Sequence, residues 1–354
     1  MRILIIPLEP TGIGRNNERL PSLIRILSRQ HQLLGLKHPR RFGTSNVPLH
    51  FMRFYLYCIR VFWFGVRRRK DFDLIFCEFE WNSLIGVAIS FVAGKPCIWD
   101  THAVDPNLSG IRHLLKKIVA RFSKIIIAVS ELDKKILINQ GFPQNKVVVI
   151  PTSAELQLVD KVNNDGDHLR RTLGLDTGKR ILIFIGNIDY PPNREASDWI
   201  NAELAPAVAA KFDDIQILIT GSGEIPVTIH KTVKYTGFVP NIYEYILASD
   251  IGLAPVWRGM GMLTKVIDFM SCAKPTVVTS YAVRGIPELT NKSNIIVAYD
   301  TRGFIRETIS LLEHLEEAQR IGLAARITIE KYYNWDSWEQ RLNEVIADCV
   351  NQGQ

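Results

Sequence analysis

Short runs of Val, Ile and Leu recur along the whole chain, and helical patterns separate them. Continuous apolar runs bounded by turn residues are typical of parallel strands that are buried on both faces. Strand–helix repeats of this kind predict α/β domains with doubly wound parallel sheets. The runs fall into two series, at residues 3–8, 73–78, 96–102, 124–130 and 146–151, and at residues 180–187, 215–221, 233–238, 250–255, 275–280 and 294–299.

The two series predict two Rossmann-like domains. A chain of 354 residues is long enough to bury a core in each domain. We expect the first domain over residues 1–152 and the second over residues 180–334. The polar stretch 153–179 between them predicts a linker with one helix, and the amphipathic C-terminal helix 335–354 is expected to pack back on the first domain.

The composition indicates a globular protein, since 47% of the residues are hydrophobic and 22% are charged. The 43 Lys and Arg against 36 Asp and Glu give a net charge of +7, which suits a protein that handles phosphates or touches an anionic membrane surface. The five cysteines form no C-x-x-C pair and predict reduced thiols in a cytosolic protein. The N-terminus does not resemble a signal peptide, and no apolar stretch is long enough to span a bilayer. We therefore expect a cytoplasmic protein, or one bound peripherally to the inner face of the membrane, and no nucleic-acid partner.

The segment 254–280 carries the strongest chemical signal. A strand ends at Pro255, a Gly-rich loop with Gly259 and Gly261 follows, and a helix is expected to begin near Leu263. A helix N-terminus behind glycines offers free N–H groups and positive potential to a phosphate. Lys265 in the first turn is placed to meet a diphosphate, and Asp268 shares its face at i+3, where a carboxylate accepts bonds from sugar hydroxyls. A plain strand–helix unit with a surface Lys–Asp pair is the alternative that these residues leave open.

This segment resembles the nucleotide-sugar signature of the retaining GT-B glycosyltransferases of family 4. In that family a Glu at the position of Asp268 binds the donor ribose, and another Glu lies eight residues earlier, where this chain has Met260. The resemblance implies a GT-B fold, in which two Rossmann-like domains face each other across a central cleft. The N-terminal domain would lie on the acceptor side, and the C-terminal domain would bind the nucleotide sugar. The residues that match the signature are Lys265, Val266, Ile267, Asp268, Phe269, Met270, Ala273, Lys274, Pro275, Thr276 and Val277.

Other landmarks of the family can be placed in both halves of the chain. The loop at 186–193 resembles the one that opens the C-terminal domain, where an Arg and a Lys commonly clamp the diphosphate. Asn187 replaces that Arg, which leaves Arg258 and Lys265 as candidates for the positive charge and Arg194 as another substitute. The donor-binding residues that the resemblance implies are Gly12, Gly14, Gly186, Asn187, Gly237, Phe238, Gly259, Met260, Gly261 and Asp268.

In the N-terminal half, the loop with Gly12 and Gly14 follows the first strand and precedes a helix. Its glycines allow the backbone to approach phosphates, although a tight strand–helix turn has the same pattern. His102 ends a strand of the doubly wound sheet and resembles the family's His that contacts the donor sugar; a core or surface histidine is the alternative. Asp100 is expected to brace this site, and Ser130 to cap the next helix.

Residues 48–70 combine a basic stripe with aromatic and aliphatic residues on several faces. Such a helix suits the headgroup region of an anionic leaflet. A helix packed on the first sheet with a solvated basic rim is the alternative. The residues predicted to bind the membrane are Arg53, Arg60, Arg67, Arg68, Arg69 and Lys70.

The resemblance implies a retaining hexosyltransferase with a UDP- or GDP-sugar donor and a glycan or lipid-linked acceptor. Catalysis would rest on His102, Lys265 and Arg258, and no cofactor or metal is expected, because no Asp-x-Asp motif stands in a suitable loop. Two alternatives remain. Met260 and Asn187 depart from the family pattern, which is compatible with a catalytically silent nucleotide-sugar-binding partner of another transferase. A nucleotide-sugar 2-epimerase shares the architecture but needs cleft carboxylates that this chain lacks.

Overall fold

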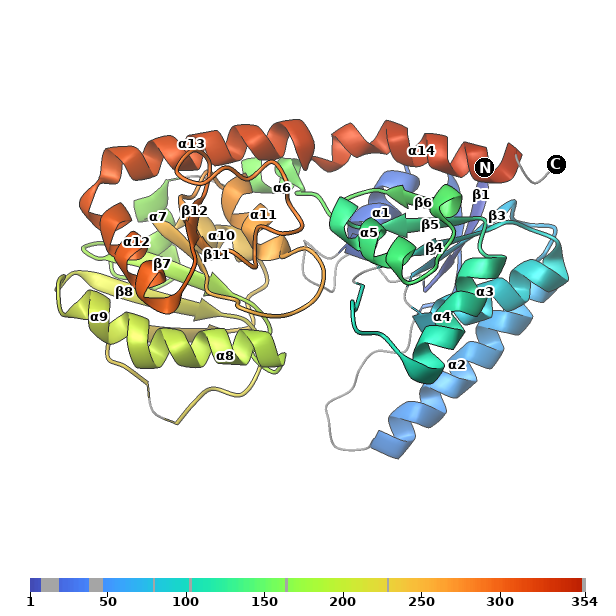
Figure 1. The fold of residues 1–354 in the computed structure, drawn as a ribbon, viewed down its shortest axis with the longest axis horizontal. Coiled ribbons are helices and arrows are strands. Elements are labelled where there is room, and N and C mark those ends of the chain that lie inside the picture. The colour runs from blue at the N-terminus through green and yellow to red at the C-terminus, as the bar shows by residue number, and fades with distance from the viewer. Residues whose placement is uncertain are drawn as a thin grey trace. The chain divides into compact units, whose positions relative to one another are not determined.

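The computed structural model describes residues 1–7, 19–37, 47–78, 80–101, 104–162, 165–227 and 229–351. The chain divides into two units, and each is built on its own six-stranded parallel sheet (Figure 1). The first unit holds the described residues up to Pro151 together with 336–351, and the second runs from Thr152 to Trp335. The prediction of two α/β domains with parallel sheets is confirmed.

The sheet of the first unit has the strand order β2-β1-β3-β4-β5-β6. Strands β3, β4 and β5 are buried at every residue, which is why they read as uninterrupted apolar runs. Strand β2, a part-exposed piece of three residues at the sheet edge, has no such run and is not predicted from the sequence. The strands are β1 (Arg2–Ile6), β2 (Gln32–Leu34), β3 (Leu74–Glu78), β4 (Cys97–Asp100), β5 (Ile125–Ala128) and β6 (Val147–Val149).

Helices cover both faces of this sheet. The connection from β1 to β2 runs in the opposite direction along the sheet from the later connections, so right-handed crossovers place α1 on one face and α2 to α5 on the other. Helix α3 packs against both α2 and α4, and it approaches α2 closely where Ile89 fills the space left by Gly65. The helices are α1 (Arg19–Leu27), α2 (Val47–Arg67), α3 (Glu80–Ala93), α4 (Gly110–Phe122), α5 (Glu131–Asn139) and α14 (Trp335–Asn351), with a 3-10 turn at Gln144–Lys146.

The sheet of the second unit has the order β12-β11-β10-β7-β8-β9. Its first strand, β7, is central, and the chain adds two strands on one side before it crosses to the other. The strands are β7 (Arg180–Ile185), β8 (Ile215–Thr220), β9 (Val233–Gly237), β10 (Ile251–Ala254), β11 (Thr276–Thr279) and β12 (Ile296–Ala298).

Residues 153–179 differ from the predicted linker with one helix. They form two short helices, α6 and α7, and Leu156, Val159, Leu169 and Leu175 are buried in the cores of the second unit. The segment is therefore part of that unit's fold. The helices of the unit are α6 (Leu156–Asp160), α7 (Gly166–Thr172), α8 (Pro191–Trp199), a π-helical segment (Ile200–Leu204), α9 (Ala205–Ala209), α10 (Ile242–Leu247), α11 (Thr264–Ser271), α12 (Thr301–Glu313) and α13 (Leu315–Tyr332).

Candidate functional site

The carboxyl edge of the second sheet has the geometry of a ligand site. Strands β7 and β10 are neighbours whose connections lead to opposite sides of the sheet, and open α/β sheets bind ligands at such a switch point. The loops after β7 and β8 touch through their backbones: a Cβ atom at Gly221 would lie 1.9 Å from the carbonyl oxygen of Gly186, and both glycines have positive φ. Only glycine fits this contact, which holds the two loops close together at the sheet edge.

Lys265 lies in the first turn of α11, directly behind the loop that follows β10. The residue is only 7% exposed, and its side chain is held in place by its neighbours. The Nζ atom donates a hydrogen bond of 2.8 Å to Oδ1 of Asn193 and lies 4.0 Å from the ring centroid of Phe184, the residue before last in β7. A cation set in this way at a helix N-terminus needs little reorganisation to meet a phosphate.

Asn193 connects Lys265 to the loop after β7. Its Nδ2 donates to the carbonyl oxygen of Asn187 at 2.9 Å, while its Oδ1 accepts the bond from Lys265. A Cβ atom at Gly186 would lie 2.6 Å from the same Nδ2. The sequence pattern contains Asn193 but assigns it no role; in the structure it positions the lysine.

Asp268 lies one turn further along α11 and is also 7% exposed. Helix α11 is buried from Lys265 to Ser271, and it packs tightly on β10, where the ring of Phe269 occupies the space beside Gly252. Burial raises the pKa of Tyr243, and the charge of Asp268 raises this pKa further. The structure thus places both Lys265 and Asp268 in the buried part of α11, three positions apart.

Arg258 lies at the rim of this site and is already paired. Its Nε donates to Oε2 of Glu195 on α8 at 2.8 Å, its Nη2 contacts Oε1, and both side chains are more than half exposed. The hydrogen bonds from Arg258 lower the pKa of the Glu195 carboxyl. A diphosphate that recruits Arg258 therefore has to compete with Glu195, a residue that the sequence pattern does not single out.

The loop of Gly259 and Met260 runs beside two tyrosines. A Cβ atom at Gly259 would lie 3.5 Å from the hydroxyl of Tyr190 and 3.8 Å from that of Tyr281. Met260, which stands where the family has its first Glu, is 47% exposed. The loop therefore presents an apolar side chain and two phenols near the position of the missing carboxylate.

The remaining donor-side residues lie in neighbouring loops. Gly261 follows in the same loop with positive φ, Gly237 ends β9, and the next residue, Phe238, is exposed. Arg194 donates to the carbonyl oxygen of Glu224 at 2.7 Å and pairs with Asp189 at 3.6 Å, so its charge connects the loops after β7 and β8.

In the first unit, Gly12, Gly14 and His102 lie outside the described residues. Asp100, at the end of β4, forms a fully buried bidentate ion pair with Arg19 at the start of α1, with N–O distances of 2.8 and 2.7 Å. This pair ties the end of β4 to the helix that follows the glycine loop. The bracing role predicted for Asp100 thus has a partner, Arg19, that the sequence analysis missed.

Ser130 caps α5, as predicted. Its Oγ accepts a hydrogen bond from the backbone N–H of Asp133 at 3.0 Å and donates to the Asp133 carboxyl at 2.5 Å. Burial raises the pKa of that carboxyl. Ser130 therefore stabilises a helix start in the first unit.

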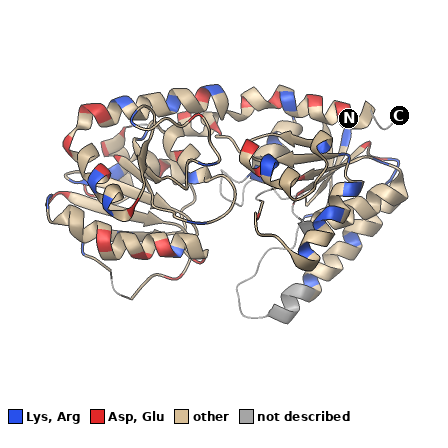
Figure 2. Cartoon of the chain, in the orientation of Figure 1, with Lys and Arg blue, Asp and Glu red and all other residues tan. Residues whose placement is uncertain are grey.

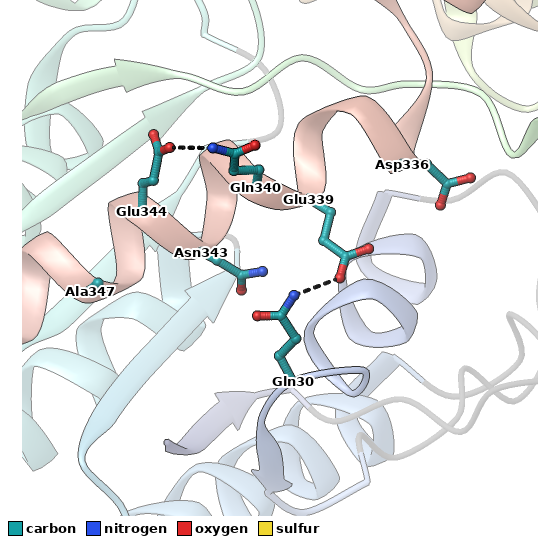
Figure 3. Close-up of a pocket in the computed structure, with 7 residues that line it drawn as sticks. All are labelled: Gln30, Asp336, Glu339, Gln340, Asn343, Glu344 and Ala347. Carbon is teal, nitrogen blue, oxygen red and sulfur yellow. Dashed lines mark hydrogen bonds between the residues drawn. The ribbon is translucent and has the colours of Figure 1, made fainter.

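A surface hollow of about 480 Å³ lies in the first unit, where α14 meets the end of α1 (Figure 3). Arg29 beside it pairs with Asp336 at 2.7 Å and with Glu339 at 2.6 Å. An anionic donor would meet mainly carboxylates and amides here, so this hollow does not suit a diphosphate. It is lined by Gln30, Asp336, Glu339, Gln340, Asn343, Glu344 and Ala347.

All six residues predicted to bind a membrane are exposed. Arg53, Arg60 and Arg67 lie on α2, and 68–70 form the turn behind it. One face of α2 packs into the core of the first unit through Tyr57 and Val61. The helix thus has the packed face expected of a helix that covers the first sheet. It also has the exposed basic stripe that this interpretation shares with the membrane-bound one.

Within the described ranges, no helix is long and apolar enough to cross a membrane. In the same part of the chain, no group of three or more His, Cys, Asp or Glu side chains is arranged to hold a metal ion.

Comparison with known proteins covers both halves of the chain. Residues 179–314 match the family model "Glycosyl transferases group 1", and residues 24–158 match the model "Glycosyltransferase Family 4". No curated protein sequence matches the chain.

Solved structures match almost the whole chain. HepE from Anabaena, crystallised in complex with UDP-glucose, superimposes with a TM-score of 0.76 at 17% identity, over 98% of this chain and 100% of that one. Sucrose-phosphate synthase from Thermosynechococcus elongatus gives a TM-score of 0.78 at 12% identity, over 99% of both chains. A putative UDP-N-acetylglucosamine 2-epimerase from Listeria monocytogenes gives 0.63 at 12% identity, over 99% of this chain and 96% of that one. At these identities the likeness concerns the fold, which is the two-domain fold of GT-B glycosyltransferases.

Proposed function

The chain belongs to the glycosyltransferases of group 1 and family 4, and we propose that it transfers a hexose from a UDP- or GDP-sugar to a glycan or lipid-linked acceptor with retention of configuration. The observation that carries the proposal is the fixed, buried Lys265 at the switch point of the second sheet. Support for a nucleotide donor also comes from HepE, whose structures contain UDP, UDP with glucose, or UDP-glucose.

In the proposed reaction, the diphosphate lies against Lys265 and the N-terminus of α11. Arg258 exchanges Glu195 for a phosphate oxygen as the nucleotide leaves. These positive charges stabilise the negative charge that develops on the phosphate when the glycosidic bond breaks through an oxocarbenium-like state. The acceptor hydroxyl attacks from the same face, and the leaving phosphate takes its proton.

The residues that complete the proposed site act on the donor's other parts. Asp268 binds the ribose hydroxyls, and His102 contacts the hexose. We propose that no metal or cofactor takes part, because the cationic side chains of the protein supply the charge that a divalent ion would bring. Turnover that is unchanged by a chelator would support this; turnover that stops and returns with Mg²⁺ or Mn²⁺ would contradict it.

The test of the transfer itself measures UDP or GDP release from a panel of nucleotide sugars, with and without a lipid-linked or glycan acceptor. A transferase releases nucleotide in an acceptor-dependent way, and the anomeric configuration of the product reports retention or inversion. Epimerisation of the donor in the absence of an acceptor would contradict the proposal and indicate a nucleotide-sugar epimerase.

A silent donor-binding partner is the second candidate. It is favoured by the exposed Met260 at the position of a family Glu and by the pairing of Arg258 with Glu195. Such a protein would bind nucleoside diphosphate in a thermal-shift screen but release none from any sugar donor.

We also propose that the enzyme binds an anionic membrane surface through the basic residues of α2 and the turn behind it. The exposure of all six residues supports this proposal. Each basic residue near such a surface contributes about 1 kcal/mol.

A further inference from the structure

Three neighbouring helices of the first unit, α2, α3 and α4, expose large apolar side chains, which form rows along α2 and α4. On α4 the exposed residues recur at i, i+3, i+7 and i+11, so they form one stripe along the helix. Half of the exposed large apolar side chains among the described residues lie on these three helices. They are Met52, Tyr55, Leu56, Ile59 and Trp63 on α2, Trp81, Phe91 and Val92 on α3, and Ile111, Leu114, Ile118 and Phe122 on α4.

The rows are adjacent and strongly exposed. Helix α3 packs against both α2 and α4, so the stripes belong to one layer of helices. Phe91 is 83% exposed, Ile111 74% and Tyr55 67%. Large apolar side chains exposed in this number on adjacent helices are unfavourable in water and mark a place where something else covers the protein.

Apart from Glu80, the first residue of α3, the charged residues of these three helices are basic. The segments 52–67, 81–93 and 110–122 contain no Asp or Glu. Figure 2 shows blue segments without red ones along α2 and α4. The exposed basic residues are Arg53, Arg60, Arg67, Arg68, Arg69, Lys70, Arg112, Lys117 and Arg121.

This charge selects the occupant. Two copies of the chain joined through this layer would bring mainly basic residues against basic residues, which opposes self-association. An anionic lipid leaflet offers phosphate groups to the basic residues and acyl chains to the apolar rows. Both features of the surface are thereby matched by one partner.

We propose that α2, α3 and α4 together form a membrane-docking face whose apolar rows insert into an anionic leaflet. The inference rests on the proposed membrane binding of α2 and extends it: the face includes α3 and α4, and apolar insertion acts together with electrostatic attraction. Hydrophobic contact of this kind persists at salt concentrations that screen the basic residues.

The experiment measures partition of the full chain onto phosphatidylcholine vesicles with and without phosphatidylglycerol. The apolar variant carries Phe91→Ser, Ile111→Ser and Leu114→Ser. Its matched control replaces three exposed apolar residues of the second unit, Leu323→Ser and Ile327→Ser on α13 and Tyr299→Ser. The apolar variant is expected to lose at least about 100-fold in partition, on the order of tenfold per inserted side chain, and the control to change by less than about threefold.

A basic variant, with Arg112→Gln, Lys117→Gln and Arg121→Gln, tests the charge of α4. It is expected to bind more weakly by a factor of about five per residue at low salt. In the wild type, Trp63 and Trp81 are about half exposed on the proposed face, so lipids with brominated acyl chains are expected to quench their fluorescence. Quenching that persists in a variant with both replaced by Phe would come from tryptophans elsewhere and would contradict insertion of this face.

The outcomes separate this inference from the proposals on which it rests. If replacing residues 67–70 with Gln releases the protein but the apolar variant still binds like wild type, the three-helix face is wrong and attachment through α2 stands. If the wild type ignores anionic vesicles, both membrane proposals are wrong. If the apolar variant instead abolishes a wild-type dimer seen by sedimentation, the occupant is a second copy. Transfer to a water-soluble acceptor, measured in parallel, reports the glycosyltransferase activity independently of these three binding outcomes.

Discussion

Replacing Lys265 with Met is the sharpest test of the donor site. Met keeps an apolar stem that can lie on Phe184, and it removes the charge that Asn193 fixes at 2.8 Å. Two unit charges about 4 Å apart at an effective dielectric constant of about 20 interact by about 4 kcal/mol. Only the part that grows in the transition state affects turnover, so we expect about 2–4 kcal/mol, or a loss of about 30- to 1000-fold in kcat.

Lys274 provides a matched control. It is also a lysine at the end of the same signature segment, its Nζ donates to the carbonyl oxygen of Leu247 at 2.9 Å, and burial lowers its pKa. Lys265→Met and Lys274→Met each remove a donor from an oxygen inside the second unit, which costs about 1–3 kcal/mol of unfolding free energy in either variant. Stability therefore does not separate the two variants, whereas turnover should.

The assay is nucleotide release at saturating donor and acceptor, with thermal unfolding measured on the same samples. Lys274→Met is expected to keep turnover within a few-fold of wild type. A folded Lys265→Met protein with near-normal turnover would refute the phosphate role of Lys265. Equal losses in the two variants would assign both lysines to the fold.

Four further predictions follow from the site and the surface. Asp268→Ala should weaken UDP or GDP binding in calorimetry, because a ribose contact is shared by ground and transition states; an unchanged dissociation constant would remove that role. His102→Ala should lower turnover far more than affinity for the free nucleoside diphosphate, and equal losses would make it structural. Replacing residues 67–70 with Gln should move the protein from anionic vesicles to the soluble fraction while activity on a soluble acceptor analogue survives; at low salt, a variant that stays bound would contradict the assignment. Burial raises the pKa of Cys272 from 9.0 to about 12. The neutral thiol therefore contributes its full share of the unfolding free energy below pH 9, and this contribution should be lost as the pH rises from 9 to 12. Thermal melts of Cys272→Ala at alkaline pH should show a smaller loss of stability than those of the wild type.

The sheets could be predicted from the sequence because most of their strands are buried on both faces. In a strand such as β7, the five residues after Arg180 are buried and apolar, and a short Val/Ile/Leu run in the sequence indicates such burial. Strand β2 could not be predicted because it is short and its residues are partly exposed. Helices α6 and α7 could not be predicted separately because they have only 5 and 7 residues. A helical period cannot be recognised over so short a length in a polar stretch.

The site could be predicted only where its residues are close along the chain. Lys265 and Asp268 are three positions apart, so helical geometry alone brings them together. Asn193 is 72 positions from Lys265, and Glu195 is 63 positions from Arg258. No periodicity connects residues at such separations, and the contacts exist because β7 and β10 are neighbours in the sheet.

Helix α4 shows why the sequence does not reveal which apolar stripes of the first unit are exposed. Its residues Ile111, Leu114, Ile118 and Phe122 have the spacing that normally predicts the buried face of an amphipathic helix. In the structure these side chains are exposed, and Val119 and Ala120 are the apolar residues that are buried. A helix that docks on a bilayer needs the same spacing as one that packs on a core, because both bury one stripe. The sequence therefore identifies the stripe, and only the position of the helix in the fold shows that the stripe faces outward, where a lipid surface can cover it.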